Sequence, residues 1–314
     1  MPNNRVTVMG SYVADLAFRL DRLPAWGETR MGQTFQLGPG GKGSNQAVAS
    51  ARAGASVAFI SKLGSDPFGE IARTLYRQEG IDTQFVFLSP NPTGAAAILI
   101  DAAHGENAII VVPGACFGLT PAEVDQATAL ISDSAIFVAQ LELPLPTVDH
   151  GLRIAHSHHV PTILNPAPAT TLPDSIYPLC DYLTPNETEA ATLTQIPVTD
   201  LTSADAAATA LLARGVRNVI LTLGAQGALI KNHTLTRHIP AVNAGPVIET
   251  TGAGDAFNGG LATALAEGMN LIEATKFACV VAGISVTRPG TAPSMPRRSE
   301  IDAIRVSQPN QHSE

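Results

Sequence analysis

Short apolar runs alternate with segments of helical periodicity along most of the chain. Apolar runs of strand length occupy residues 6–10, 57–61, 135–139, 162–165, 181–184 and 219–223. Helical patterns occupy residues 45–53, 68–79, 146–156 and 272–285. This order predicts an α/β fold, a doubly wound and mainly parallel sheet with helices on both faces, in which ligands bind beyond the carboxyl ends of the strands.

Four other segments, at 16–20, 34–37, 95–100 and 108–112, alternate apolar and polar residues. This periodicity indicates half-buried strands, which we expect to be antiparallel, with a turn at 104–106 joining the second pair. We interpret them as a small β-sheet lid over a ligand site, formed by segments 12–37 and 93–113. The length of 314 residues fits a single α/β domain, 1–314, that carries this lid.

Composition and charge limit the kinds of molecule that we expect this protein to bind. Hydrophobic residues make up 45% of the chain and the net charge is −8. Nucleic acid and anionic membrane are therefore not expected as partners, because both require a basic face. Three widely spaced cysteines argue against a disulfide framework or a zinc site. Neither a signal-peptide pattern nor a membrane-spanning run is present, so we expect a cytoplasmic location.

The strongest candidate for a chemical site is a turn of small residues at 252–254. A strand-like run at 246–249 precedes it and an apolar helical segment follows it. Gly252, Ala253 and Gly254 would leave backbone N–H groups free at a helix start, and these groups bind anions together with the helix dipole. Asp255 follows in the first turn, where a carboxylate would repel a phosphate unless it acts on the attacking group. A Gly-rich helix start with an ordinary first-turn acid has the same pattern.

Other polar residues lie at turns and at strand ends. Lys42 and Asn45 project from a second Gly-rich turn at a helix start, although a turn selected for packing has the same composition. Glu142 follows a strand. Asn186 and Glu189 lie on one helical face, where their oxygens suit an outer-shell Mg²⁺ site, and Asn186 can also serve as a helix N-cap.

Two of these stretches resemble the signatures of the ribokinase-like (PfkB) carbohydrate kinases. Residues 40–47 match G-G-K-G-x-N-x-A, and residues 249–257 match [DE]-T-T-G-A-G-D-x-F, in the family's order along the chain. The resemblance covers nearly the whole chain. It implies a sugar kinase that transfers the γ-phosphoryl group of ATP, with the 5-hydroxyl of D-ribose as the expected acceptor.

The family's functional residues map onto this chain by motif. The resemblance implies that Asp255 is the catalytic base and that the amides of Gly252, Ala253 and Gly254 stabilise the transferring phosphoryl group. It assigns the sugar contacts to Val13, Asp15, Gly41, Lys42, Asn45 and Glu142. It assigns the nucleotide contacts to Asn186, Thr222, Gly224, Gly227 and Cys279.

The resemblance also implies two cations and a homodimer. It places Glu189 in the outer shell of Mg²⁺, and it draws a K⁺ site from Glu249, Thr251, Ser285, Arg288, Gly290 and Ser294. Glu249 stands where the family more often has Asp. Dimerisation is expected through the exposed edges of the lid strands.

The acceptor sugar is open to alternatives at one position. Kinases of this family that act on ribose carry Asn where this chain has Val13, whereas bacterial kinases of 2-deoxyribose are similar in having an apolar residue there. We therefore keep 2-deoxy-D-ribose, or another sugar or nucleoside, as an alternative substrate. A non-catalytic sugar sensor is a remote alternative, since it would need a lost base and Asp255 is present.

Overall fold

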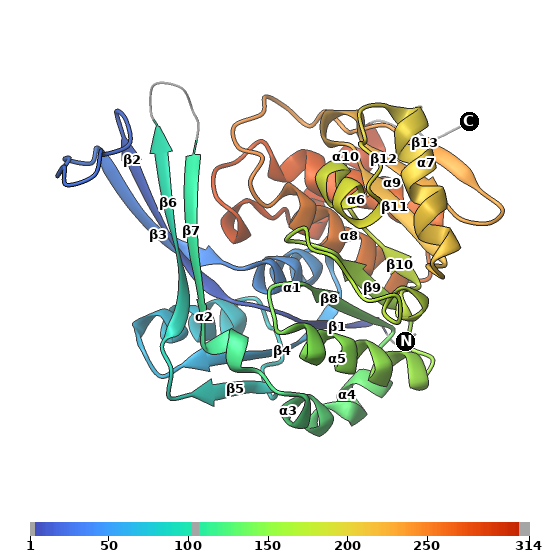
Figure 1. Ribbon diagram of the computed structural model, residues 1–314, viewed down its shortest axis with the longest axis horizontal. Helices are drawn as coiled ribbons and strands as arrows, with labels where there is room; N and C mark the ends of the chain where they lie inside the picture. The colour runs from blue at the N-terminus through green and yellow to red at the C-terminus, as the bar shows by residue number, and fades with distance from the viewer. Residues whose placement is uncertain (1–3, 102–106, 308–314) are drawn as a thin grey trace.

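The computed structural model describes residues 4–101 and 107–307 (Figure 1). In this part of the chain nine strands form one sheet, in the order β13-β12-β11-β10-β9-β8-β1-β4-β5. Neighbouring strands from β11 across to β5 are parallel, and β12 and β13 are antiparallel additions at one edge. The strands are β1 Arg5–Met9, β4 Ser56–Gly64, β5 Val86–Ser89, β8 Ile136–Gln140, β9 Thr162–Asn165, β10 Tyr182–Leu183, β11 Asn218–Thr222, β12 Ala228–Lys231 and β13 Thr236–Ile239.

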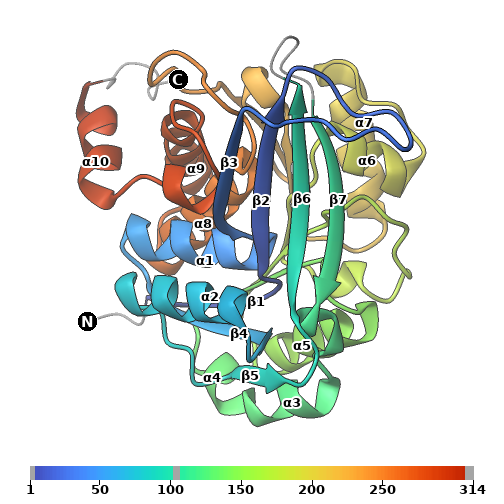
Figure 2. The ribbon, with the colours of Figure 1, turned by 90° about the vertical axis from the view of Figure 1, so that its left-hand side faces the viewer.

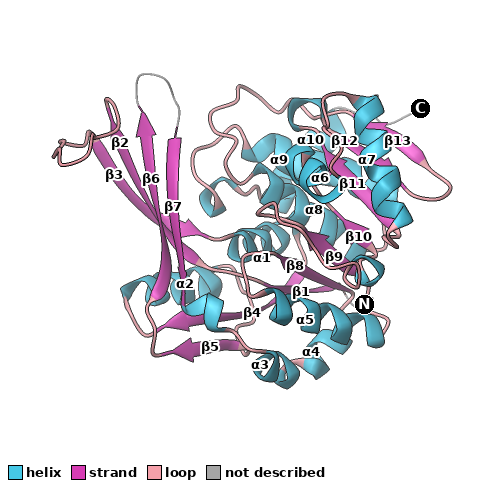
Figure 3. Cartoon of the chain, in the orientation of Figure 1, coloured by secondary structure: helices cyan, strands magenta, loops and turns pink. Residues whose placement is uncertain are grey.

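Helices cover both faces of this sheet (Figure 3), which confirms the predicted doubly wound architecture. One face packs against α1 Lys42–Ala53, α2 Pro67–Gln78, α8 Ala253–Ala266, α9 Leu271–Ser285 and α10 Arg298–Ser307. The other packs against α3 Pro121–Gln126, α4 Thr128–Ser132, α5 Leu145–Ser157, α6 Glu187–Thr194 and α7 Leu201–Ala213.

Each face of the sheet has its own hydrophobic core. In β8, Ile136 and Val138 enter one core, while Phe137 and Ala139 enter the other. All four side chains are buried. A strand buried on both faces is apolar at every position, and this is why the sequence shows continuous apolar runs here rather than alternation.

The four alternating segments form a separate sheet, in the order β3-β2-β6-β7, which stands beside the main body (Figure 2). Its strands are β2 Val13–Leu20, β3 Thr34–Gly40, β6 Thr93–Asp101 and β7 Asn107–Gly114. The expectation that all four are antiparallel is wrong, because β2 and β6 pair in parallel. Alternation reports which face is buried and carries no information on strand direction. The predicted turn at 104–106 and both ends of the predicted domain lie outside the described residues.

The strand predicted at 246–249 is not formed. The N–H groups of Ile248 and Glu249 both donate to the carbonyl oxygen of Val286, at 2.8 and 3.2 Å. The segment between β13 and α8 is therefore a loop held on the end of α9, in which Val247 and Ile248 are exposed. No helix in the described part of the chain is long and apolar enough to cross a membrane.

Candidate active site

The site begins where α1 and α8 pack closely. A Cβ atom on Gly259 would lie 2.4 Å from the Cβ atom of Ala49, so a side chain at this position would push the helices apart. Because Gly259 and Ala49 lie at this contact, the helices approach closely and their first turns meet. These turns carry the two Gly-rich motifs, which are far apart in the sequence (Figure 1).

Asp255 lies in the first turn of α8, as predicted, and is 6% exposed. Both of its carboxylate oxygens accept hydrogen bonds from α1. Asn45 Nδ2 donates to Oδ2 at 2.9 Å, and Gln46 Nε2 donates to Oδ1 at 3.0 Å. Asn45 is also buried, and within the described residues its Oδ1 atom has no hydrogen-bond partner, which leaves an acceptor for a ligand hydroxyl.

The start of α1 is built around Glu142. The Glu142 carboxylate accepts hydrogen bonds from the Lys42 N–H group at 2.9 Å and from the Ser11 hydroxyl. Gly41, the helix N-cap, has a φ of 87°, a conformation that residues with side chains rarely adopt. A Cβ atom there would also lie 2.8 Å from the backbone nitrogen of Val13, so the predicted sugar residues Val13, Gly41, Lys42 and Glu142 are brought together.

Asp15 completes the polar side of this region. Burial raises its pKa from 3.8 to about 6, and the negative charges of Glu142, Asp255 and Glu249 add to the effect. The Thr291 hydroxyl lies 3.3 Å from Asp15 Oδ2 and 3.0 Å from the carbonyl oxygen of Pro39, and it lowers the pKa only in part. Among the described residues, the Thr291 hydroxyl is therefore the one side-chain donor to Asp15, at 3.3 Å.

Lys42 is the cation among these carboxylates. Burial acts to lower its pKa, but the charges of Asp255, Glu142 and Glu189 outweigh it, and the pKa is raised. Burial also raises the pKa of Glu189, with a contribution from Asp255, whereas the Asn186 backbone and Lys42 act in the opposite direction. The structure thus places a positive charge between the predicted sugar side and the predicted nucleotide side.

Asn186 and Glu189 form a capping box at the start of α6. Glu189 accepts from the N–H group of Asn186 at 2.9 Å and from its Nδ2 atom at 3.0 Å, and Asn186 Oδ1 caps the Glu189 N–H group at 2.8 Å. Both carboxylate oxygens are engaged, so the residues present fit an outer-shell role toward Mg²⁺, through water, better than direct ligation. Thr222, at the end of β11, bridges to Asn186.

The other predicted nucleotide residues have local structural roles. Gly224 and Gly227 have positive φ angles in the turn after β11, and a Cβ atom on Gly227 would lie 2.1 Å from the carbonyl oxygen of Ile239. Cys279 lies on α9 within the hydrophobic core, and burial raises the pKa of its thiol to about 12.

Some residues predicted for K⁺ contact one another, and several of their polar groups are already engaged. Glu249 accepts from the Gly290 N–H group at 2.9 Å. The carbonyl oxygen of Ser285 accepts from the Arg288 N–H group at 3.2 Å, and the Arg288 side chain pairs with Glu300. Within the described chain no group of three His, Cys, Asp or Glu side chains could hold a metal ion. A cation here would therefore depend on Glu249 together with neutral oxygens such as those of Thr251 and Ser294.

The expected row of free amides is shorter than predicted. The Ala253 N–H group donates to the carbonyl oxygen of Thr250 at 3.1 Å, so the prediction of a free amide at Ala253 is wrong for this structure. Gly252 caps α8 with a φ of 81°, and Gly254 lies one residue into the helix, where an N–H group has no partner within its own helix. The dipole and these two amides remain the source of positive potential at this end of α8.

Sequence reasoning missed the residues that hold Asp255 in place. Gln140 Nε2 donates to Gln46 Oε1 at 2.7 Å, and Gln46 Nε2 also donates to Asn165 Oδ1 at 3.1 Å. On the other side of the first turn, Asn258 Nδ2 donates to the carbonyl oxygen of Gly254 at 2.8 Å. Gln46 follows Asn45 directly, and Gln140 and Asn165 end adjacent parallel strands. Their position at strand ends could have identified Gln140 and Asn165 from the sequence.

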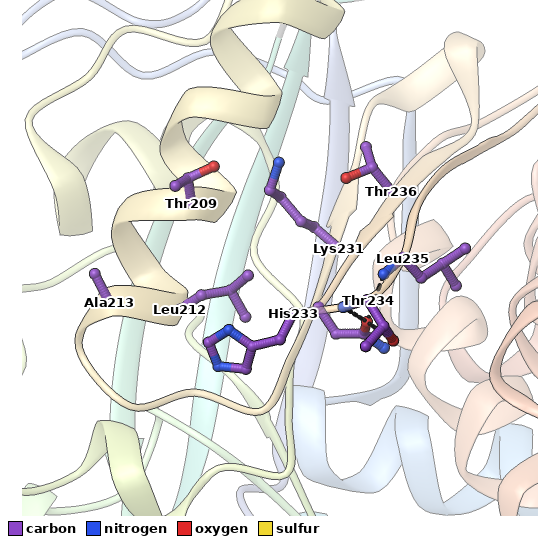
Figure 4. Close-up of a pocket in the computed structure, with 9 residues that line it drawn as sticks. Thr209, Leu212, Ala213, Lys231, His233, Thr234, Leu235 and Thr236 are labelled. Carbon is purple, nitrogen blue, oxygen red and sulfur yellow. Dashed lines mark hydrogen bonds between the residues drawn. The ribbon is translucent and has the colours of Figure 1, made fainter.

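A cavity of about 520 Å³ lies elsewhere, between α7 and the β12–β13 hairpin (Figure 4). Lys231 and His233 are among the residues that line it, and none of the predicted site residues does so. The cavity is therefore separate from the region around Asp255.

Known proteins share both the sequence and the fold of this chain. The model of the pfkB family of carbohydrate kinases matches residues 3–298. The chain is 43% identical over 296 residues to a ribokinase of Haemophilus influenzae, which covers 94% of this chain and 96% of that protein. It is 36% identical over 294 residues to a deoxyribokinase of Salmonella typhi, covering 93% and 95%. The structure of Arabidopsis thaliana ribokinase complexed with ribose and ATP matches with a TM-score of 0.91 at 30% identity, over 97% of this chain and 99% of that chain.

Proposed function

Because the chain belongs to the pfkB family of carbohydrate kinases, we propose that it transfers the γ-phosphoryl group of ATP to the 5-hydroxyl of D-ribose. The product is D-ribose 5-phosphate. The main observation in support of this proposal is the contact between the two motifs, in which Asn45 and Gln46 donate hydrogen bonds to the buried carboxylate of Asp255. This contact places an acid next to the N-terminus of α8, with Lys42 close enough for its pKa to respond to Asp255.

Each group has a role that follows from its chemistry. Asp255 orients the sugar hydroxyl and accepts its proton as the bond to phosphorus forms. The N-terminus of α8, with the amides of Gly252 and Gly254, stabilises negative charge on the transferring group. Lys42 adds a positive charge beside it. When bound, Mg²⁺ neutralises charge on the nucleotide phosphates, and Glu189 fits an outer-shell position toward it.

The sugar pocket in this proposal is formed by the residues around the start of α1. Asp15 and Glu142 accept hydrogen bonds from sugar hydroxyls, Asn45 accepts through its unpaired Oδ1 atom, and Gly41 allows the ligand to approach the backbone. We propose that the nucleotide is bound by Asn186, Thr222, Gly224, Gly227 and Cys279. That set is supported by the contact of Asn186 with Thr222 and by the family match.

A second acceptor, 2-deoxy-D-ribose, is favoured by one observation. Val13 is 6% exposed and lies against the Gly41 turn, so it offers a 2-hydroxyl no hydrogen-bond partner. An unpaired buried hydroxyl costs ~1–3 kcal/mol. Greater overall similarity to the ribokinase than to the deoxyribokinase supports ribose as the first choice.

The small sheet is proposed as a lid on a single domain, and as the surface of a homodimer. Thr291 donates toward Asp15 and Pro39, so the sheet already contacts the loop after α9. Ile109, Ile110, Val111 and Val112 are each about half exposed or more on the edge strand β7. A row of exposed aliphatic residues on an open strand edge is typical of an interface between chains. A cytoplasmic location would supply ATP to such an enzyme, and cell fractionation tests it.

An assay of ADP release tests the proposal directly. We expect turnover with D-ribose and ATP, compared with 2-deoxy-D-ribose, fructose and nucleosides, each with and without K⁺. Stimulation by K⁺ would support the proposed site at Glu249 and Gly290. The Asp255→Asn variant should lose on the order of 10²–10⁴-fold in kcat, the usual contribution of a general base. Full turnover by that variant, or no sugar-dependent ADP release with any acceptor, would contradict the proposed function.

A further inference from the structure

A chain of buried amide side chains leads from the main sheet to Asp255. Gln140 at the end of β8 donates to Gln46 Oε1, and the Gln46 Nε2 group is shared between Asp255 Oδ1 and Asn165 Oδ1. Asn165 at the end of β9 in turn donates from Nδ2 to the carbonyl oxygen of Thr184 at 3.1 Å. Gln46 and Gln140 are fully buried, and Asn165 is 6% exposed.

This chain permits one orientation of the Gln46 amide. If the amide were reversed, its oxygen would face both Asp255 and Asn165 Oδ1, and its NH₂ group would face the NH₂ group of Gln140. The sheet therefore determines that Gln46 presents a donor to Asp255. Because the acceptor is a carboxylate in a side chain that is only 6% exposed, this hydrogen bond is stronger than one between neutral groups.

Asn45 and Gln46 differ in whether they have a polar atom available to a ligand. Asn45 keeps a free Oδ1 atom, whereas both polar atoms of Gln46 are satisfied by protein groups. We propose that Gln46 is a positioning residue, which holds the Asp255 carboxylate at the angle that directs its other lone pairs toward the acceptor hydroxyl. This inference rests on the proposed function and assigns Gln46 no contact with the sugar or the nucleotide.

Two substitutions separate positioning from simple packing. Gln46→Leu keeps the volume of the side chain and removes the donor. Misplacing a reacting group by about 1 Å costs on the order of 10²-fold in rate, and we expect kcat to fall by that amount. The KM values for sugar and ATP should change by less than about threefold, since the interaction is needed in the transition state and not for binding.

Gln46→Glu keeps the shape and makes the donor depend on pH. The introduced carboxyl lies beside Asp255, and two buried carboxylates in contact hold one proton between them. At low pH that proton restores a donor to Asp255, and above the apparent pKa of the pair the two charges repel. The charged groups that face Asp255 from other elements are Asp15, Lys42 and Glu189, and they are the same in all variants. The ratio of variant kcat to wild-type kcat should therefore be highest at low pH and fall as the pH rises, whereas the ratio for Gln46→Leu stays flat.

Thr263→Val provides a matched control. Thr263 Oγ1 also joins α8 to α1, through the Ser50 carbonyl oxygen at 3.2 Å, but it does not touch Asp255. This variant should keep the wild-type kcat and pH profile. Wild-type kcat in Gln46→Leu, or a ratio for Gln46→Glu that does not depend on pH, would overturn the inference.

A measurement without substrate separates this inference from the proposed function. The ¹³C resonance of the Asp255 carboxyl carbon can be assigned through its absence in Asp255→Asn. We expect its chemical shift at pH 7.5 to change in Gln46→Leu, because a hydrogen-bond donor to the carboxylate is lost, and to stay unchanged in Thr263→Val. An unchanged chemical shift in Gln46→Leu would refute the inference even if the protein proved to act on no sugar.

Discussion

We predict that the substitution Asp15→Asn raises the free energy of unfolding at neutral pH. The pKa of Asp15 is raised from 3.8 to about 6 because burial disfavours the charged form, and the carboxylates around it add to this effect. One pKa unit corresponds to ~1.4 kcal/mol, so an ionised Asp15 destabilises the folded protein at neutral pH by up to ~3 kcal/mol. The side chain keeps some exposure, and solvent screening leaves ~1–3 kcal/mol that Asp15→Asn should recover.

The sign of this effect depends on pH. Below pH 3.8 the carboxyl is protonated in both the folded and the unfolded protein, so it does not affect the free energy of unfolding. Between 3.8 and about 6 the unfolded chain loses its proton first, and stability falls as the pH rises. Above that range the penalty is constant. The advantage of Asp15→Asn should therefore be small at pH 4 and largest above pH 6.

Urea unfolding of the ligand-free protein at pH 4 and pH 7.5 measures the difference. A gain of ~1–3 kcal/mol at pH 7.5 corresponds to a rise in Tm on the order of 5 °C. Asp174→Asn is the control, because the Asp174 side chain is 85% exposed in an ion pair with Arg214, and we expect a change within ~0.5 kcal/mol. Equal stabilisation of Asp15→Asn at both pH values, or none at pH 7.5, would refute the reasoning. The same variant should bind sugar more weakly, because an acceptor is replaced in part by a donor.

Three further substitutions test other parts of the structure. Val13→Asn supplies a partner for a 2-hydroxyl, and we expect kcat/KM for ribose relative to 2-deoxyribose to rise about tenfold, the equivalent of one ~1.4 kcal/mol hydrogen bond; an unchanged ratio would place Val13 outside the sugar pocket. Gly259→Ala forces a Cβ atom to within 2.4 Å of the Ala49 Cβ atom, so chemical unfolding should show a loss of ~1–3 kcal/mol, whereas Gly118→Ala, where a Cβ atom would meet nothing within 4 Å, should cost less. Ile110→Lys puts a charge on the exposed strand β7, and sedimentation should show a monomer where the wild type is a dimer; a wild-type monomer would contradict the proposed interface.

The layered fold could be predicted because inner strands of the main sheet such as β1, β4, β8 and β9 are buried on both faces. Such strands are continuous apolar runs, and β9 has the bounds that the pattern predicts. The pattern failed where tertiary contacts compete with local preference. Residues 246–249 include Val247 and Ile248, which favour strands, but the Val286 carbonyl oxygen takes two of the N–H groups that a strand would need.

The sequence predicted the two motifs of the site, but it did not predict which of their side chains contact one another. Their residue types identified Asp255, Lys42 and Asn45, but the sequence does not report the angle at which α1 crosses α8. That angle decides whether the neighbour of Asn45 also reaches Asp255, and Gln46 does so across 209 positions of the chain. The sequence also does not show that the Ala253 N–H group donates to the Thr250 carbonyl oxygen, because this hydrogen bond depends on the turn that the backbone forms there.

Asp255 and Asp15, two carboxyl groups of the site, differ in the hydrogen-bond donors that the protein supplies to them. Asp255 receives an amide donor on each oxygen, from Asn45 and Gln46, so its charge is stabilised before any ligand arrives. Asp15 receives only the hydroxyl of Thr291, which also faces Pro39 and can donate to one acceptor at a time. A ligand with several hydroxyl groups supplies the donors that Asp15 lacks and adds little to those that Asp255 already has. For the proposed function, this difference suits Asp15 to binding a polyol and Asp255 to acting on it.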